Sequence, residues 1–392
     1  MTKKSDAPAI RFKGFSDAWE QRKLSEITDK VTEKNAGLQY VETFTNSAEF
    51  GIISQRDFFD HDIAKLGSLD GYYIVKTEDF VYNPRISTSA PVGPINRNKL
   101  GRTGVMSPLY TVFRPHDIDT TYLEYFFKCG YWHSFMNFNG DSGARSDRFS
   151  IRDNVFFQMP IPIPDIDEQR KIGELLTCLD NLITLHQRKF EKLTNVKKSM
   201  LEKMFPQNGS SYPEIRFKGF TDPWEQRKAK EICSIGTGKS NTQDQVDDGK
   251  YPFYIRSDVP VRSNKYLYDC EAVITIGDGN IGKVFHYVNG KFDLHQRCYK
   301  MTDFKDIWGK YFFYYFSTKF YDRAMKMTAK ATVDSVRLEM ISEMDIKKPP
   351  QISEQKQIAE FFANLDNLIT LHQRELEKLQ NIKKSMLEKM FV

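Results

Sequence analysis

Residues 168–205 read EQRKIGELLTCLDNLITLHQRKFEKLTNVKKSMLEKMF, and residues 354–391 read EQKQIAEFFANLDNLITLHQRELEKLQNIKKSMLEKMF. A direct count finds 27 of 38 positions identical at a constant offset of 186. Apolar residues recur in each copy at three- and four-residue spacing, and neither copy contains proline. This pattern predicts an amphipathic helix, which could extend for roughly 57 Å at about 1.5 Å per residue. Because the apolar stripe is narrow, each helix is expected to pack against another helix.

The expected partner of each helix is the other copy. Counted in heptads, the two apolar seams suit coiled-coil packing and consist of Ile172, Leu179, His186, Leu193 and Met200 in the first copy and Ile358, Leu365, His372, Leu379 and Met386 in the second. An antiparallel pair about a local two-fold axis would bring His186 and His372 together. It would place Leu179 towards Leu379 and Leu193 towards Leu365. We interpret the histidines as polar residues that fix the helix register, with a metal or pH-switch role as the alternative.

A second repeat begins each half of the chain. Residues 10–27 read IRFKGFSDAWEQRKLSEI and residues 215–232 read IRFKGFTDPWEQRKAKEI, with 14 of 18 positions identical at an offset of 205. We call these two segments the start motifs. Their aromatic residues are interpreted as an apolar clasp that begins a domain rather than as a ligand site, and they are Phe12, Phe15, Trp19, Phe217, Phe220 and Trp224.

Between the repeats lie two variable regions, residues 29–160 and 234–349, which share little beyond short β-rich runs broken by Gly, Asn, Asp and Pro. The predicted fold class is therefore α+β: two similar α/β domains separated by two long helices that pair as an antiparallel coiled coil with pseudo-two-fold symmetry. The expected boundaries are residues 1–165 for the first domain, 166–205 for the first helix, 206–214 for a linker, 215–351 for the second domain and 352–392 for the second helix.

Composition limits the classes of function. The 392 residues carry a formal net charge of +5, so contacts to nucleic acid would have to come from local basic patches. The five cysteines form no CxxC motif, which argues against a disulfide framework or a zinc site. The polar N-terminus and the lack of an apolar run of about 20 residues lead us to expect a cytoplasmic protein with no membrane association.

Three features together resemble the specificity subunits of type I DNA restriction-modification systems. They are the duplicated RFKGF with a following Trp, the repeated helix with LDNLITLHQR, and the Glu-Gln-x-x-Ile sequence at Glu168, Gln169 and Ile172 and again at Glu354, Gln355 and Ile358. The resemblance implies two target-recognition domains, each of which reads one half of an interrupted double-stranded DNA sequence. It also implies that the coiled coil sets the gap between the half-sites.

The resemblance further implies a larger assembly for phage defence. Two modification subunits would bind S-adenosylmethionine and methylate adenine, and restriction subunits would use ATP and Mg²⁺. No cofactor is expected to bind directly to this chain. Paired readers on one duplex face must lie about one helical turn, ~34 Å, apart, and a helix of roughly 57 Å can span that distance.

Catalysis by the chain itself is not expected. Residues 277–282 (GDGNIG) fit a dinucleotide-binding pattern, but a strand-like run follows them, so a hairpin turn is predicted. Gly238-Lys239-Ser240 resembles the end of a Walker A loop, yet the leading glycine position holds Cys233. The Asn-Pro-Pro-aromatic or Asp-Pro-Pro-aromatic tetrapeptide of amino-methylating enzymes is missing, because Arg85 follows Asn83-Pro84.

Other interpretations of the sequence remain open. The Glu354-x-Lys356 pattern resembles that of some nucleases, but we interpret Glu354 as helix-start charge. A non-catalytic two-headed protein adaptor with a coiled-coil spacer is the alternative function. A self-sufficient restriction enzyme is disfavoured.

Candidate DNA contacts lie in polar and basic loops of the variable regions, since base edges and phosphates are bound by such side chains. In the first region they are Asn83, Arg85, Ser87, Thr88, Arg97, Lys99, Arg145, Ser146 and Arg148. In the second region they are Arg256, Ser257, Asp278, Asn280, Lys283, His295, Gln296, Arg297, Lys330 and Thr332.

Overall fold

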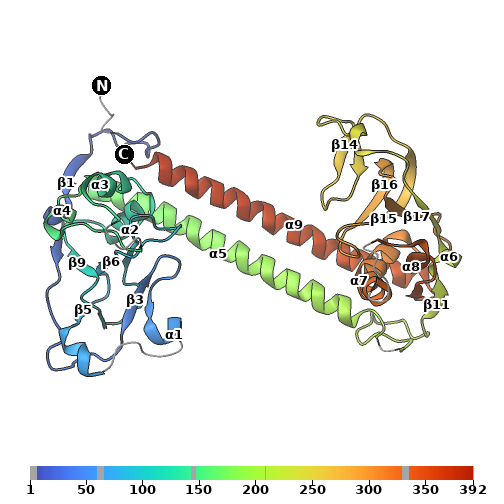
Figure 1. The fold of residues 1–392 in the computed structure, drawn as a ribbon, viewed down its shortest axis with the longest axis horizontal. Coiled ribbons are helices and arrows are strands. Elements are labelled where there is room, and N and C mark those ends of the chain that lie inside the picture. The colour runs from blue at the N-terminus through green and yellow to red at the C-terminus, as the bar shows by residue number, and fades with distance from the viewer. Residues whose placement is uncertain (1–6, 60–65, 143–146, 208, 329–334, 392) are drawn as a thin grey trace. The chain divides into compact units, whose positions relative to one another are not determined.

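The computed structural model describes residues 7–59, 66–142, 147–207, 209–328 and 335–391. The chain divides into two compact units, of which unit 1 comprises Met1–Leu185 and Glu375–Val392 and unit 2 comprises His186–Arg374 (Figure 1). Each unit contains an α+β domain and one half of each long helix, α5 (Ile166–Lys203) and α9 (Ile352–Lys389). The predicted fold class is confirmed. Among the described residues, no helix combines the length and apolar character that a membrane span requires.

Unit 1 contains a four-stranded antiparallel sheet in the order β2-β9-β6-β7, with two further strand pairs, β3-β4 and β5-β8. The strands are β2 (Thr28–Lys30), β3 (Phe44–Ser47), β4 (Gly51–Ser54), β5 (Tyr73–Val75), β6 (Phe80–Tyr82), β7 (Ile95–Arg97), β8 (Gly104–Met106) and β9 (Thr111–Pro115). Every residue of β6 is buried, and Phe80 stacks on Phe113 of β9 with ring centroids 5.6 Å apart. Strand β6 packs on both sides, because Phe80 and Tyr82 join a core with α2, whereas Val81 joins a core with β5 and β8.

Short helices complete unit 1: η1 (Leu24–Glu26), α1 (Gln55–Phe59), η2 (Leu66–Gly71), α2 (Thr120–Lys128), α3 (His133–Asn139) and α4 (Asp153–Phe156). Helix α2 begins after Asp119, whose carboxylate accepts a hydrogen bond from the backbone N–H of Tyr122. The apolar face of α2 joins the sheet, the first half of α5 and the end of α9 in a single core. The core of unit 1 therefore includes both long helices.

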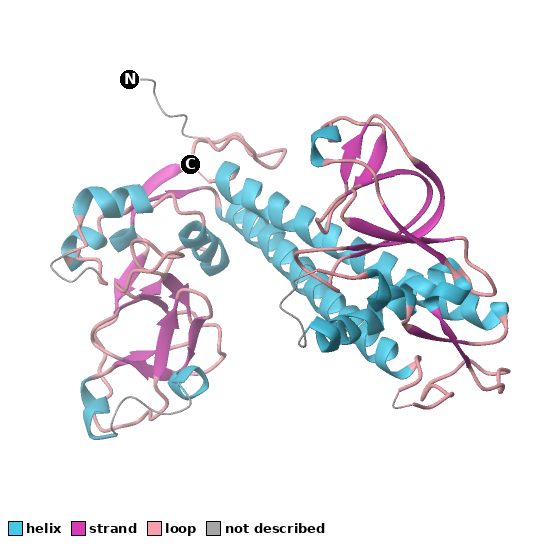
Figure 2. Cartoon of the chain, turned by 45° about the vertical axis from the view of Figure 1, so that its right-hand side comes forward, coloured by secondary structure: helices cyan, strands magenta, loops and turns pink. Residues whose placement is uncertain are grey.

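Unit 2 contains a six-stranded sheet in the order β12-β17-β15-β16-β13-β14, whose strands curve strongly (magenta, Figure 2). They are β12 (Ser234–Thr237), β13 (Tyr251–Tyr254), β14 (Val261–Ser263), β15 (Tyr268–Ile276), β16 (Phe285–Leu294) and β17 (Cys298–Thr302). All neighbours are antiparallel except β13 and β16, which are parallel. The predicted hairpin turn at residues 277–282 is confirmed, since it joins the antiparallel strands β15 and β16.

The helices of unit 2 are α6 (Ala229–Ile232), η3 (Thr242–Asp244), α7 (Gly309–Thr328) and α8 (Leu338–Ser342). The aromatic run on α7 packs against the sheet and α9, where Tyr311, Phe312 and Phe316 are fully buried. A stacked pair, Phe205 and Phe362, joins the end of the α5 segment to α9 in the same core. The same architecture thus closes both units, although the two sheets differ.

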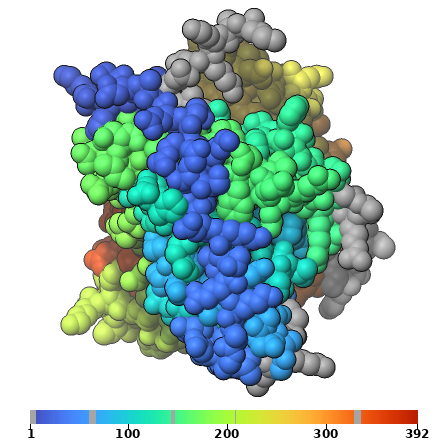
Figure 3. Space-filling view, turned by 90° about the vertical axis from the view of Figure 1, so that its left-hand side faces the viewer, coloured from blue at the N-terminus to red at the C-terminus, as the bar shows by residue number. Residues whose placement is uncertain are grey.

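Each domain is closed by a two-stranded ladder between its start motif and the strand before its long helix. In unit 1, β1 (Glu20–Lys23) pairs with β10 (Pro160–Ile163), and in unit 2, β11 (Glu225–Lys228) pairs with β18 (Asp345–Lys348). Segments from the start and the end of the domain are accordingly interleaved on the face of unit 1 drawn in Figure 3. This pairing joins the two ends of each variable region.

The start motif is more than an apolar clasp, because its arginine binds a buried glutamate at the start of the long helix. Arg11 donates to Glu168 through Nε (2.7 Å) and Nη2 (2.8 Å), and Arg216 binds Glu354 with the same two distances. The two carboxylates are 0% and 1% exposed. A side-chain hydrogen bond to Glu168 raises the pKa of Arg11. The interpretation of Glu354 as simple helix-start charge is therefore incomplete, since the charge is buried and paired.

The glutamine that follows each of these glutamates also has a repeated role. Gln169 accepts a hydrogen bond from the backbone N–H of Asp119 (2.9 Å) and donates to the carbonyl of Pro164 (2.9 Å). Gln355 accepts from the backbone N–H of Trp308 (2.8 Å) and donates to the carbonyl of Pro349 (2.9 Å). The N–H groups of Asp119 and Trp308 lie at the start of α2 and α7, where they would otherwise be left without partners. The Glu-Gln pair therefore ties the long helix to its domain.

The long helices run antiparallel within each unit and share one repeated ion pair. In unit 1, Asp180 of α5 forms an ion pair with Nζ of Lys383 of α9 (2.5 Å) and accepts a hydrogen bond from the hydroxyl of Tyr125 (2.7 Å). In unit 2, Asp366 of α9 forms an ion pair with Nζ of Lys197 of α5 (2.5 Å) and accepts a hydrogen bond from the hydroxyl of Tyr314 (2.7 Å). Each aspartate therefore joins both helices to a helix of the variable region.

The predicted helix seam is confirmed. Leu179 and Leu379 lie in the core of unit 1, and Leu193 and Leu365 lie in the core of unit 2. In unit 2, the Nδ1 atoms of His186 and His372 are 3.2 Å apart, as the antiparallel pairing predicts.

Candidate nucleic-acid interface

In unit 1, the loop that follows β6 presents several of the predicted DNA contacts. Asn83 shapes the loop, because its amide donates to the carbonyl of Asn46 (2.8 Å) and its Oδ1 accepts from the backbone N–H of Arg85 (3.0 Å). Arg85, Ser87 and Thr88 are exposed. Hydrogen bonds from the Asn83 side chain to nearby backbone groups fix the loop, and the three exposed side chains remain at the surface.

The structure brings this loop beside a second predicted segment. Arg85 and Arg148 form a backbone bridge, and the N–H of Ile86 donates to the carbonyl of Asp147 (3.0 Å). A hollow of about 370 Å³ adjoins the loop and is lined in part by Arg85. Two basic segments far apart in the sequence therefore form one surface. Arg145 and Ser146 lie outside the described residues.

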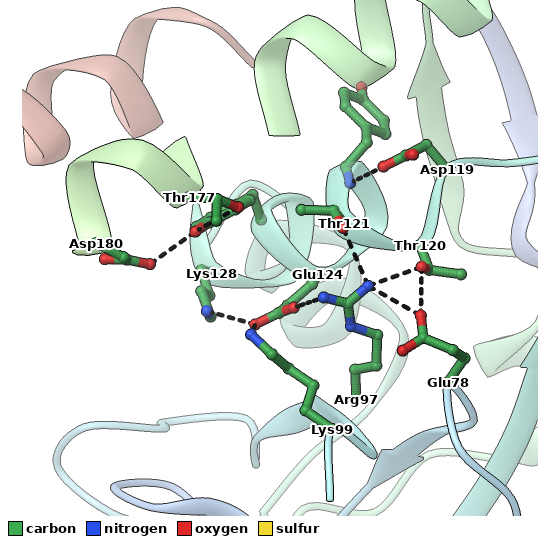
Figure 4. Close-up of polar contacts among 12 residues, drawn as sticks. Glu78, Arg97, Lys99, Asp119, Thr120, Thr121, Glu124, Lys128, Thr177 and Asp180 are labelled. Atoms are coloured by element: carbon green, nitrogen blue, oxygen red, sulfur yellow. Dashed lines mark hydrogen bonds and ion pairs between the residues drawn. The ribbon is translucent and has the colours of Figure 1, made fainter. Parts of the chain in front are cut away.

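Arg97 and Lys99 lie in a different environment, the ion-pair network drawn in Figure 4. The side chain of Arg97 is 8% exposed, and it binds Glu78 (3.0 Å) and Glu124 (2.6 Å). Glu124 also binds Lys99 (3.3 Å) and Lys128 (2.7 Å). Burial raises the pKa of Glu124, but these cations outweigh it and lower the pKa overall. The contacts favour a structural role for Arg97, which fastens β7 to α2, whereas Lys99 stays largely exposed.

In unit 2, three of the predicted residues form one cluster. Asp278 accepts a hydrogen bond from Nη1 of Arg297 (2.7 Å) and another from Nη1 of Arg256 (3.2 Å). The side chains of Arg297 and Arg256 are 62% and 46% exposed, against 20% for Asp278. Burial alone would raise the pKa of Asp278, but the two arginines lower it, so this carboxyl is ionised near neutral pH.

Neighbouring predicted residues support this cluster. His295 is buried, and its Nδ1 accepts the backbone N–H of Arg297 at 3.1 Å. Burial, followed by the charges of Arg256 and Arg297, lowers the pKa of His295, so its ring is neutral at pH 7. The exposed Gln296 donates to Oδ1 of Asn241 at 2.6 Å. His295 therefore contributes to the structure beneath the cluster rather than to a surface contact.

The remaining predicted residues of unit 2 are more scattered. The hydroxyl of Ser257 donates to the carbonyl of Val259 (2.6 Å), and Asn280 is exposed in the β15–β16 turn. Nζ of Lys283 lies over the ring of Tyr321, 5.7 Å from its centroid. Lys330 and Thr332 lie outside the described residues.

Among the described residues, no group of three or more His, Cys, Asp or Glu side chains is arranged to hold a metal ion. Residues 16–195 and 221–381, which together make up most of the chain, each match the family described as type I restriction modification DNA specificity domain. The chain belongs to this family.

Curated type I specificity subunits are similar to about three fifths of the chain. The type I restriction enzyme MjaVIII specificity subunit of Methanocaldococcus jannaschii is 26% identical over 265 residues, 59% of this chain and 61% of that protein. A putative MjaX specificity subunit from the same organism is 23% identical over 261 residues, 61% of this chain and 60% of that protein. The chain thus spans about three fifths of the length of these two relatives.

The fold has a solved counterpart. The crystal structure of the type I restriction-modification S subunit from M. genitalium aligns with a TM-score of 0.67 and 12% sequence identity, covering 98% of this chain and 99% of that one. At this identity the similarity establishes the fold alone.

In this specificity-family chain, sequence reasoning missed the residues that support the unit 2 cluster. Asn241, the partner of Gln296, follows the Gly238-Lys239-Ser240 segment that was assessed only as a nucleotide loop. A Cβ atom at Gly238 would lie 2.2 Å from the carbonyl oxygen of Leu294 and 2.4 Å from that of His295. The glycine therefore permits close backbone packing. A polar Gly-Lys-Ser-Asn loop after a short strand was the available signal.

Proposed function

We propose that this chain is the DNA-recognition subunit of a type I restriction-modification complex and has no catalytic activity of its own. Each unit reads one half of a bipartite duplex target. The two start motifs and the two long helices form a duplicated frame. The observation that carries this proposal is that two specificity-domain regions with unlike sheets and loops are attached to this frame. Repeated frame contacts suit a common partner, whereas different loops suit two different base sequences.

Two modification subunits bind S-adenosylmethionine and methylate adenine, and restriction subunits supply ATP- and Mg²⁺-dependent cleavage in the cytoplasm. Leu182 and Leu185 on α5 and their repeat equivalents Leu368 and Leu371 on α9 are exposed. Two equivalent apolar pairs suit two copies of one partner, because exposed apolar surface commonly marks an interaction site.

Base-resolution sequencing of methylated adenine in cells that express the complex tests the proposal. We expect an interrupted two-part recognition sequence with the wild-type chain. Arg85→Ala should alter only the half-site read by unit 1, and Arg297→Ala only the half-site read by unit 2. Lys13→Ala and Lys218→Ala are matched controls, because these exposed lysines occupy the same place in the two start motifs.

Two outcomes contradict the proposal. Methylation without a two-part sequence would exclude bipartite recognition. A complex that assembles but has no affinity for duplex DNA would support the two-headed protein adaptor instead.

A second experiment tests whether the helices set the spacing. Seven residues inserted at equivalent places in α5 and α9 keep the heptad register and lengthen each helix by about 10.5 Å at 1.5 Å per residue. We expect the same half-sites with a spacer that is longer by up to about three base pairs, at ~3.4 Å each. An active complex with an unchanged spacer would refute this role.

A further inference from the structure

The Arg256, Asp278 and Arg297 cluster lies where three loops of the unit 2 sheet meet. Strands β13 and β16 are parallel, so the loops that hold Arg256 and Arg297 leave the sheet at the same edge. Asp278 follows β15, whose last residue, Ile276, pairs with Cys298, the residue after Arg297. The sheet topology therefore places one carboxylate between two guanidinium groups.

The backbone around the cluster is fixed by short hydrogen bonds. The N–H of Gly277 donates to the carbonyl of Arg297 at 2.7 Å, and the N–H of Val336 donates to the carbonyl of Gly277 at 2.7 Å. A Cβ atom at Gly277 would lie 2.5 Å from the carbonyl oxygen of Arg297, so no larger residue fits without movement. The loops carrying Asp278 and Arg297 are thus held in contact independently of the ion pair.

The cluster keeps hydrogen-bonding capacity for a ligand. Arg297 uses Nη1 to bind Asp278, and within the described part of the chain its Nε and Nη2 groups have no partner. With one ionised aspartate and a neutral His295, the two arginines leave the cluster with a charge of about +1. It therefore attracts DNA while presenting a guanidinium edge in a defined orientation.

A defined orientation matters for base recognition. The commonest base-specific contact in the major groove is an arginine that donates two parallel hydrogen bonds to O6 and N7 of guanine. A free arginine side chain loses rotamer freedom when it makes this contact. A carboxylate that already holds the guanidinium reduces that loss. Among the described residues of unit 1, Arg85 and Arg148 have no comparable carboxylate partner.

We propose that Arg297, oriented by Asp278, reads a guanine in the half-site bound by unit 2. Arg297 is the specificity-determining residue, and Asp278 is its positioning residue. Arg256 balances the carboxylate and holds it in place. This inference rests on the proposed function as a DNA reader and adds a base type to one of its half-sites.

The test is methylated-adenine sequencing with the assembled complex carrying Arg297→Ala, Arg297→Lys, Asp278→Asn or Asp278→Glu. In wild type we expect a G·C pair in the unit 2 half-site. Arg297→Ala should lower discrimination at that single position by roughly 5- to 150-fold. Arg297→Lys should also lower it, because lysine keeps the charge but lacks the planar guanidinium that donates two parallel hydrogen bonds in a fixed geometry. Asp278→Asn should lower it at the same position, and Asp278→Glu should restore part of it. The unit 1 half-site should not change.

The outcomes separate this inference from the function on which it rests. A bipartite sequence with unchanged base preference in Arg297→Lys and Arg297→Ala would overturn the inference while the proposed function stands. A wild-type complex without a bipartite sequence would overturn the proposed function itself. If Asp278→Asn prevents folding, as thermal unfolding of the complex would show, Arg297→Lys still decides the matter, because it leaves a cation beside Asp278.

Discussion

Replacing Arg11 with Met should selectively loosen the attachment of the start motif to α5. Arg11 makes two charged hydrogen bonds to Glu168, whose side chain has no exposed surface. Removing one partner of a buried ion pair costs about 3–5 kcal/mol, because the other charge stays buried without compensation. At 1.4 kcal/mol per factor of ten, local opening should become roughly 100- to 4,000-fold more frequent.

Hydrogen–deuterium exchange on the full chain measures this opening at a defined amide. The backbone N–H of Ile10 donates to the carbonyl of Lys389 at 3.0 Å, directly beside the arginine. Its repeat equivalent, the N–H of Ile215, donates to the carbonyl of Lys203 at the same distance. Arg11→Met should speed exchange at Ile10 and leave Ile215 unchanged, whereas Arg216→Met should have the opposite pattern.

Two further variants sharpen the experiment. Glu168→Gln combined with Arg11→Met should recover part of the lost protection, because removing both charges leaves no buried ion. Arg216→Met should increase the frequency of local opening more than Arg11→Met does. Trp19 still donates to Glu168 at 3.2 Å, whereas Nε1 of Trp224 has no partner among the described residues. Exchange at Ile10 within twofold of wild type in Arg11→Met would refute the reasoning.

Three other predictions concern the helix pair and the sheet of unit 2. Asp180→Asn and Asp366→Asn should each lower the stability of the contact between α5 and α9 by about 1 kcal/mol, since both ion pairs are partly exposed. Urea unfolding of the two variants measures this loss of stability. A loss confined to one variant would contradict the equivalence of the two sites. Burial, then His186 and Lys189, lower the pKa of His372, so the unfolded chain binds the proton more tightly and helix pairing should weaken as pH falls below about 6.5. Thermal unfolding between pH 5 and 8 should show this loss in wild type and a smaller one in His372→Gln; equal pH dependence would exclude the histidine pair as the cause. Gly238→Ala should lower the thermal stability of unit 2 by about 2 kcal/mol or more, because a Cβ atom would collide with two carbonyl oxygens, and an unchanged melting temperature would show that the loop can move aside.

The sequence predicted the frame well because repetition supplies its own internal comparison. The heptad seam placed His186 opposite His372 from spacing alone, and the two Nδ1 atoms are 3.2 Å apart. The pairing of Arg11 with Glu168 was not predicted, although both residues lie in repeated motifs. Sequence separation hides such a contact, because the partners are 157 positions apart in the sequence and no periodic pattern joins them.

The loop residues were harder to predict for a different reason. Arginines in polar loops look alike in a sequence, but Arg97 is buried between two glutamates, whereas Arg297 is largely exposed. The difference depends on which strands are neighbours. Arg97 ends β7 beside α2, and Arg297 lies in a loop at the edge where β13 and β16 run parallel. Strand order in the variable regions carries no repeated signal, so these environments follow only from the folded sheet.

The division between repeated and variable residues also explains how two unlike domains can share one frame. Arg11 and Glu168, which hold the domain of unit 1 to α5, are repeated residues, and so are Lys383 and Asp180, which join α9 to α5. In unit 1 the variable region contributes to these contacts the hydroxyl of Tyr125, which binds Asp180, and the backbone N–H of Asp119, which binds Gln169. A variable region therefore has to supply a helix with a tyrosine at this place and a backbone N–H at the start of that helix, while its sheet and loops can differ freely. That requirement leaves the loops of the two sheets unconstrained by the frame, as the proposed reading of two different half-sites requires.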